Sequence, residues 1–157
     1  MKTLVVDDEG TARVLLQNIL NEYGPVDTAA DANEALDSVR NALDSGSPYD
    51  LICLDIVMEE VDGLQVLRAI RQTEIERQVA PSKVIMITVR TDTPTVMRAV
   101  RGQCDHYLAK PIDKAILQEE LEKMGLISSA RSCGHADKRT LPTWLEPGSF
   151  RSRFWHG

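Results

Sequence analysis

The sequence predicts an α/β fold in which helices cover both faces of a five-stranded parallel sheet, the doubly wound arrangement. Three features of residues 1–125 support this prediction. Short β-rich runs recur, segments with helical spacing of apolar residues separate them, and two of the runs are apolar on both faces. Parallel strands need crossover connections, and right-handed crossovers place helices on both sides of the sheet. At 157 residues the chain is about one domain long.

The first half of the chain gives two strands and two helices in alternation. Residues 3–6 read as a strand, and the following segment, 11–23, has a helical face made of Ala12, Val14, Leu15 and Ile19. Gly24-Pro25 ends that helix, because glycine suits the position after a helix and proline cannot continue one. A strand over 26–29 and a helix over 32–43 follow, the helix with Ala35, Leu36, Val39 and Leu43 on its inner face.

The second half repeats the alternation. Residues 51–54 and 84–87 are apolar on both faces, as expected of central parallel strands. Between them, residues 64–78 form a predicted helix with Val66, Leu67 and Ile70 in register. The remaining predicted elements are a helix over 94–101, a strand over 106–109 and a helix over 113–124 that turns Ile116, Leu117 and Leu121 inward.

Composition and charge exclude several classes of protein. Hydrophobic residues make up 43% and charged residues 27% of the chain, typical of a globular protein. No apolar stretch is long enough to cross a membrane and no signal peptide is evident, so we expect a cytoplasmic protein. Residues 1–125 carry 22 acidic and 13 basic residues, which argues against nonspecific nucleic-acid binding there. Three widely spaced cysteines favour free thiols.

Polar residues follow the predicted strands where ligands bind in doubly wound sheets. Asp7 and Asp8 follow the first strand, Asp55 the third, Thr88 the fourth and Lys110 the fifth. Carboxylates gathered in one crevice repel each other, and a hard divalent cation with oxygen ligands, Mg²⁺, removes that conflict. A phosphoryl group carried on one carboxylate would be neutralised by the metal, the ammonium group and the hydroxyl together.

The same residues carry a family resemblance. The segments that match are VVDDE at 5–9, LDIVMEEVDG at 54–63, MIT at 86–88 and YLAKP at 107–111. In this order and spacing they resemble the receiver (CheY-like) domain of bacterial two-component response regulators. The resemblance covers residues 1–125 and implies a flavodoxin-like sheet with strand order 2-1-3-4-5.

The resemblance also implies a role for each site residue. Asp55 is then the phosphoacceptor, and Mg²⁺, with Mn²⁺ as an open alternative, binds to Asp7, Asp8, Asp55 and the backbone carbonyl of Val57. Thr88 and Tyr107 are the switch residues, and Lys110 pairs with the phosphate, preceding a Lys110-Pro111 bond expected to be cis. The domain would catalyse only its own phosphorylation and dephosphorylation, and would not act as an enzyme on other substrates.

Partners follow from the same resemblance. The phosphoryl donor would be a sensor histidine kinase or a histidine phosphotransfer protein. A downstream protein would bind to the face formed by the fourth helix, the fifth strand and the fifth helix, and homodimer formation stays open. We expect no nucleic-acid partner and no membrane span.

Four departures from the family pattern involve Glu59, Val89, the pair Val57 and Arg90, and Gln103. Glu59 replaces the usual proline, so the loop after Asp55 loses a rigid turn and gains an acid. Val89, with Val57 and Arg90 beside the same opening, is expected to affect the rates at which phosphate is gained and lost. Gln103 stands where glycine commonly precedes the fifth strand. None of these changes removes a group that the reaction needs.

The C-terminal tail, residues 126–157, differs in composition from the rest of the chain. They carry five basic and two acidic residues and all four Trp and Phe residues of the chain, namely Trp144, Phe150, Phe154 and Trp155. The tail is too short for a conventional output domain and shows no helix-turn-helix pattern. The interpretations left open are an extension without a bound partner, docking onto this chain or a second copy, and contact with nucleic acid or a membrane.

The sequence therefore predicts a stand-alone response regulator that signals by phosphorylation-dependent protein contact. A phosphorelay intermediate is the alternative within the family. A constitutive interaction module whose tail binds nucleic acid through Arg139, Arg151 and Arg153 is the alternative from another class. A phosphohydrolase of the dehalogenase type is disfavoured, because Val57 occupies the position of its second acid.

Overall fold

The computed structural model describes residues 1–89, 94 and 104–128 of the chain. Its five strands form one parallel sheet in the order β2-β1-β3-β4-β5. The strands are β1 (Thr3–Val6), β2 (Val26–Ala29), β3 (Leu51–Asp55), β4 (Lys83–Thr88) and β5 (His106–Ala109). The predicted fold class and strand order are confirmed.

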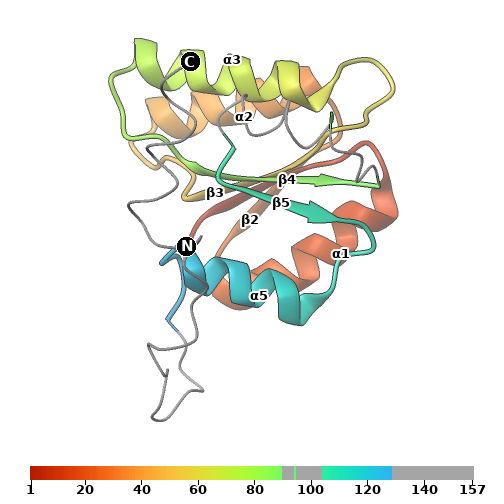
Figure 1. Ribbon diagram of the computed structural model, residues 1–157. Helices are drawn as coiled ribbons and strands as arrows, with labels where there is room; N and C mark the ends of the chain where they lie inside the picture. Colours follow the sequence, from red (N-terminus) through yellow and green to blue (C-terminus); the bar gives the residue numbers. More distant parts are fainter. Residues whose placement is uncertain (90–93, 95–103, 129–157) are drawn as a thin grey trace.

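Helices cover both faces of the sheet. Figure 1 shows α2 (Ala32–Asp44) and α3 (Gly63–Glu76) on one face and α1 (Gly10–Leu20) and α5 (Lys114–Lys123) on the other. A short 3₁₀ helix (Asn21–Tyr23) continues α1. The helix predicted over 94–101 falls outside the described residues except for Pro94, which is helical, and the tail from residue 129 onward also falls outside them.

Aspartate side chains begin three of the four described α-helices. Asp31 accepts a hydrogen bond from the backbone N–H of Glu34 at the start of α2. Asp62 caps α3 at Leu64, and Asp113 caps α5 by accepting from two backbone amides. A carboxylate at this position satisfies amides that have no partner within the helix, so each helix starts directly after the loop that leaves a strand.

Each face of the sheet has its own hydrophobic core. Alternate strand residues such as Leu54 and Met86 pack with Leu67 and Ile70 of α3. The intervening residues, among them Cys53 and Ile85, pack with α1 and α5 on the opposite face. Strands β3 and β4 are therefore buried on both sides, as their two-sided apolar sequences predict. Cys53 and Cys104 are free thiols, and Cys133 lies outside the described residues.

The predicted inner faces of two helices need correction. In α1 the buried residues are Leu16, Ile19 and Leu20, whereas Val14 and Leu15 are 55% and 45% exposed. In α5, Leu117 and Leu121 are buried but Ile116 is half exposed. Residues 16, 19 and 20 share a helical face. Leu15 borders that face and Val14 lies opposite it, so the run of apolar residues at 14–16 shifted the predicted face. None of the described helices is long and apolar enough to cross a membrane.

Candidate functional site

The predicted site residues meet at the carboxyl ends of four strands. Asp7 and Asp8 directly follow β1, and Lys110 directly follows β5. Asp55 and Thr88 are the last residues of β3 and β4. The sequence predicted that these two strands end one residue earlier, at 54 and 87. Because β1, β3, β4 and β5 are neighbours in one parallel sheet, these side chains share a single edge.

The centre of the site is a buried pair of carboxylates bridged by lysine. Lys110 Nζ lies 2.8 Å from Asp7 Oδ2 and 3.2 Å from Asp55 Oδ2. The side chains of Asp7 and Asp55 are only 1% and 6% exposed, and that of Lys110 is 13% exposed. Glu9 lies at the margin, with a carboxylate oxygen 3.8 Å from the same ammonium nitrogen. The ammonium group of Lys110 therefore pairs with two carboxylates that are buried from solvent.

Backbone amides fix the remaining carboxylate oxygens. The N–H of Glu9 donates to Asp7 Oδ1 at 2.9 Å, and the N–H of Val57 donates to Asp55 Oδ1 at 3.1 Å. Both oxygens of each buried carboxylate thus have a partner. Asp8 is exposed and accepts instead from the N–H of Glu59, across the crevice, at 3.0 Å.

The electrostatics of the pair favour a proton or a cation. Burial and the charge of Asp7 together raise the pKa of Asp55 to about 6, although Lys110 and the Val57 amide act in the opposite direction. For Lys110, burial lowers the pKa, but the hydrogen bond to Asp7 and the charges of both acids outweigh it, so its pKa is raised. Lys110 therefore stays charged, but its single positive charge does not balance the charges of both Asp7 and Asp55.

The donor set fits a hard divalent cation. Asp7, Asp8 and Asp55 each offer a carboxylate oxygen, and these atoms lie within 4.8 Å of one another. Two of the acids are buried and the third faces solvent, so protein oxygens and water together could complete an octahedral shell. Such all-oxygen ligation suits Mg²⁺ and does not resemble a zinc or copper site.

The start of α3 is packed against the backbone of Asp55. A Cβ atom placed on Gly63 would lie 2.0 Å from the carbonyl oxygen of Asp55, and the N–H of Gly63 donates to the carbonyl of Ile56 at 2.9 Å. Only glycine fits at this distance. The glycine that ends the LDIVMEEVDG segment therefore allows α3 to close the loop beside the site.

The two predicted switch residues lie on the β4–β5 side. Thr88 is fully buried, and its carbonyl accepts from the N–H of Lys110 at 2.8 Å. Tyr107 is partly buried against the core that packs on α2 and α3. The Lys110-Pro111 bond is cis, as the resemblance implied.

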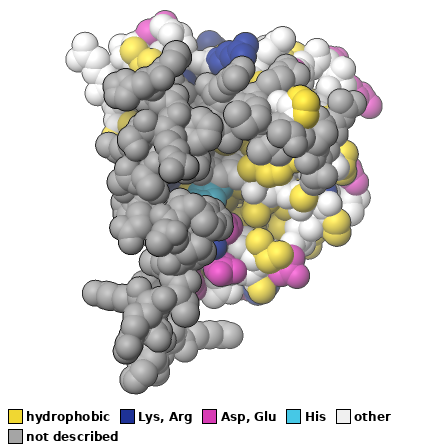
Figure 2. All heavy atoms as spheres, in the orientation of Figure 1, with side chains coloured by type: hydrophobic (Ala, Val, Ile, Leu, Met, Phe, Trp, Pro, Cys, Tyr) yellow, Lys and Arg dark blue, Asp and Glu magenta, His cyan; other side chains and the backbone are white. Residues whose placement is uncertain are grey.

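The departures from the family pattern have different surroundings. Val89 is 68% exposed and lines an apolar groove of about 330 Å³ with Leu15, Pro111 and Ile112. Val57 is also exposed. Figure 2 shows that acidic and hydrophobic side chains lie next to one another on the lower right of the face in view. Arg90 and Gln103 lie outside the described residues.

Sequence reasoning missed Arg13 and the backbone amides that bind the site carboxylates. Arg13 Nη1 donates to the carbonyl oxygen of Asp7 at 2.6 Å, which ties α1 to the loop after β1. Its place in the first turns of a helix that follows two acids was a usable signal. The amides of Glu9, Val57 and Glu59 were missed as well, and no side-chain pattern could reveal them because every residue except proline carries an N–H.

Comparisons with known proteins agree with this geometry. The family model described as "Response regulator receiver domain" matches residues 3–122. The chain is 32% identical over 125 residues to hybrid signal transduction histidine kinase L of Dictyostelium discoideum, a match that covers 79% of this chain and 7% of that protein. It is 28% identical over 124 residues to the transcriptional regulatory protein CitT of Halalkalibacterium halodurans, a match that covers 77% of this chain and 50% of that protein.

Solved structures share the fold. The CheX–CheY–BeF₃–Mg²⁺ complex from Borrelia burgdorferi includes a chain that is 27% identical to this one, with a TM-score of 0.68. That match covers 79% of this chain and 89% of the solved chain. By contrast, the chain spans half or less of the two relatives described above.

Proposed function

Because the chain belongs to the response regulator receiver domain family of two-component signalling, we propose that Asp55 accepts a phosphoryl group from a phosphohistidine. The donor is a sensor histidine kinase or a histidine phosphotransfer protein. One observation carries the proposal: Asp55 is buried beside Asp7 and contacts Lys110, with the exposed Asp8 close by. This arrangement places an acceptor carboxylate within a cluster able to neutralise phosphate charge.

In the proposed transfer, a carboxylate oxygen of Asp55 attacks phosphorus while the phosphorus–nitrogen bond of the donor breaks, and the donor imidazole retains the electron pair. Lys110, which donates a hydrogen bond to Asp55 in the structure, then forms an ion pair with the phosphoryl oxygens. Thr88, at the end of the adjacent strand, supplies a hydroxyl on the other side. The chain acts on its own carboxylate and is not an enzyme for separate substrates.

The acids Asp7, Asp8 and Asp55, with the backbone carbonyl of Val57, would hold Mg²⁺. The bound cation would offset the negative charge of the acids and of the entering phosphoryl group. The Mg²⁺ and BeF₃ in the similar CheX–CheY complex support this assignment. Mn²⁺ accepts the same oxygen ligands and should substitute for Mg²⁺.

Phosphorylation would act by adding negative charge beside Thr88 and Tyr107, which biases the face that includes β5 and α5 toward a target protein. A stand-alone regulator would then gain affinity for that target. The hybrid histidine kinase among the relatives supports a second role, in which the phosphoryl group passes on to another histidine. Transfer of the phosphoryl group from the phosphorylated chain to a histidine phosphotransfer domain would favour the relay role. Tighter binding of the phosphorylated chain to a target protein would favour the stand-alone regulator.

The first experiment is intact-mass spectrometry after incubation with acetyl phosphate, with and without Mg²⁺. We expect the wild-type chain to gain one phosphoryl group in a Mg²⁺-dependent manner. Asp55→Asn should gain none, and Asp50→Asn, at an exposed acid remote from the cluster, should behave as wild type. Failure with acetyl phosphate, a sensor kinase and beryllofluoride alike would refute the phosphoacceptor assignment.

A further inference from the structure

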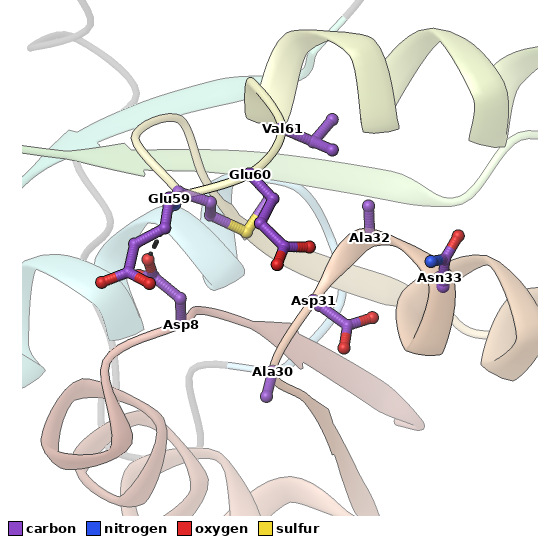
Figure 3. Close-up of a pocket in the computed structure, with 9 residues that line it drawn as sticks. Asp8, Ala30, Asp31, Ala32, Asn33, Glu59, Glu60 and Val61 are labelled. Atoms are coloured by element: carbon purple, nitrogen blue, oxygen red, sulfur yellow. Dashed lines mark hydrogen bonds between the residues drawn. The ribbon is translucent and has the colours of Figure 1, made fainter.

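A backbone amide reaches the exposed acid of the site from the opposite loop. The N–H of Glu59 donates to Asp8 Oδ2 at 3.0 Å and joins residues 51 positions apart in the sequence. Figure 3 shows this hydrogen bond at one end of a pocket of about 260 Å³ that both residues line. Glu59 belongs to the loop between β3 and α3, and Asp8 to the loop after β1.

This contact is the main restraint on Asp8. Asp7 and Asp55 are buried and held by Lys110 and by the amides of Glu9 and Val57. Within the described part of the chain, the bond from Glu59 is the one hydrogen bond found to the Asp8 side chain. Repulsion from the two neighbouring carboxylates favours rotation of the exposed side chain away from the cluster. A fixed donor on the far side of the crevice opposes that rotation.

We propose that the backbone amide of Glu59 is a positioning group that holds Asp8 in place for a divalent cation. The inference rests on the proposed function, because it assigns the cation to this acid cluster. The bond uses only Asp8 Oδ2, so Oδ1 stays available as a ligand. The amide thus reduces the rotational freedom that Asp8 loses when a cation binds, and thereby increases affinity.

The test compares two substitutions at residue 59 in the full-length chain. Glu59→Pro removes the amide hydrogen and the carboxylate, whereas Glu59→Ala removes only the carboxylate. Mn²⁺ is titrated in, and the free ion is followed by electron paramagnetic resonance. We expect Glu59→Pro to bind Mn²⁺ roughly 3- to 10-fold more weakly than Glu59→Ala, the effect of losing one hydrogen bond. Urea unfolding of both variants separates this effect from a loss of fold.

Amide NMR tests the contact without introducing proline. Asp8→Ala removes the acceptor, so the Glu59 amide proton should move upfield and exchange faster with solvent. The amide of Val57, which donates to Asp55, is the internal control and should change little. This measurement decides the matter if Glu59→Pro fails to fold.

The outcomes separate this inference from the function on which it rests. Equal Mn²⁺ affinity of folded Glu59→Pro and Glu59→Ala, with wild-type binding intact, would overturn the positioning role alone. A Glu59 amide that does not respond to Asp8→Ala would overturn it too. No Mn²⁺ binding by the wild-type chain would overturn both the positioning role and the metal site.

Discussion

The Asp55 carboxylate is subject to opposing electrostatic influences. Burial and Asp7 raise its pKa to about 6, while Lys110 and one backbone amide partly compensate. Asp55 is therefore mostly ionised at pH 7, but its ionisation is less favourable in the folded chain than in the unfolded chain. The site also attracts a cation, because an added positive charge offsets the repulsion between Asp55 and Asp7.

The raised pKa predicts that Asp55→Asn stabilises the protein in the absence of Mg²⁺. The folded-state pKa of about 6 exceeds the ordinary value of 3.8, so ionisation of Asp55 opposes folding above pH 6, and the penalty fades as the pH falls toward 4. We expect the substitution to raise the free energy of unfolding by about 1–2 kcal/mol at pH 7.5, and by much less at pH 4.5. Urea denaturation at both pH values measures this difference.

Asp37→Asn is the matched control, since Asp37 is exposed and, among the described residues, its side chain makes a single long ion pair, with Arg40. Its substitution should leave stability nearly unchanged at both pH values. Saturating Mg²⁺ should stabilise the wild type more than Asp55→Asn. A loss of stability in Asp55→Asn at pH 7.5 would contradict the dominance of burial and Asp7 over Lys110.

The side chains of the site could be predicted from the sequence, but not how they are held. Parallel strands end at one edge, so the order of Asp7, Asp55 and Lys110 relative to apolar runs is enough to bring them together. The amides of Glu9, Val57 and Glu59 depend on loop paths that side-chain identity does not specify. The sequence suggested that Glu59 would loosen its loop, whereas its N–H makes a contact that proline could not make.

At the level of elements, the strands were easier to predict than the orientation of the helices. A two-sided apolar strand is buried whichever way it faces, so β3 and β4 followed directly from composition. In α1, apolar residues occupy consecutive positions 14, 15 and 16, and more than one inner face was compatible with the pattern. Contact with the sheet selects Leu16, Ile19 and Leu20.

Adjacent leucines in α1 provide a test of its orientation. Leu16 is 1% exposed and Leu15 is 45% exposed. We expect Leu16→Ala to lower the free energy of unfolding by about 2–4 kcal/mol, because it leaves a cavity against the sheet. Leu15→Ala should lower it by less than about 1 kcal/mol. Chemical denaturation of the two variants measures this, and similar losses for both would mean that α1 is rotated from the orientation described.

A buried network of charges also escaped sequence prediction. Arg71 of α3 bonds to Glu74, to the carbonyl of Ser82 and to Asp105, which joins α3 to the residues preceding β4 and β5. Arg71 and Glu74 are at most 9% exposed. A three-residue spacing on a helix usually indicates a surface ion pair, and only the tertiary fold brings Ser82 and Asp105 to the same place. The network ties α3 to the amino ends of β4 and β5, at the edge of the sheet opposite the site.

At the scale of the whole molecule, the sheet links the two hydrophobic cores to the site. Residues of β1, β3 and β4 alternate between the two cores, and their carboxyl ends carry Asp7, Asp55 and Thr88. The positions of these side chains are therefore set by packing on both faces. Such a scaffold can bear the repulsion among the site acids, because the cost is spread over a well-packed domain.

Charge over the whole chain predicts which partners it avoids. The net charge is −6 and the acids are concentrated in residues 1–125, whereas residues 126–157 are basic and contain all the Trp and Phe. Repulsion between the acidic part and the phosphates of a nucleic acid should outweigh the attraction of those phosphates to the few arginines of the tail. We expect no saturable binding of the full-length chain to a labelled single-stranded oligonucleotide at micromolar protein and about 150 mM salt, as measured by fluorescence anisotropy. Binding that falls steeply with salt and disappears when Arg139, Arg151 and Arg153 are changed to Gln would instead support a tail that binds nucleic acid.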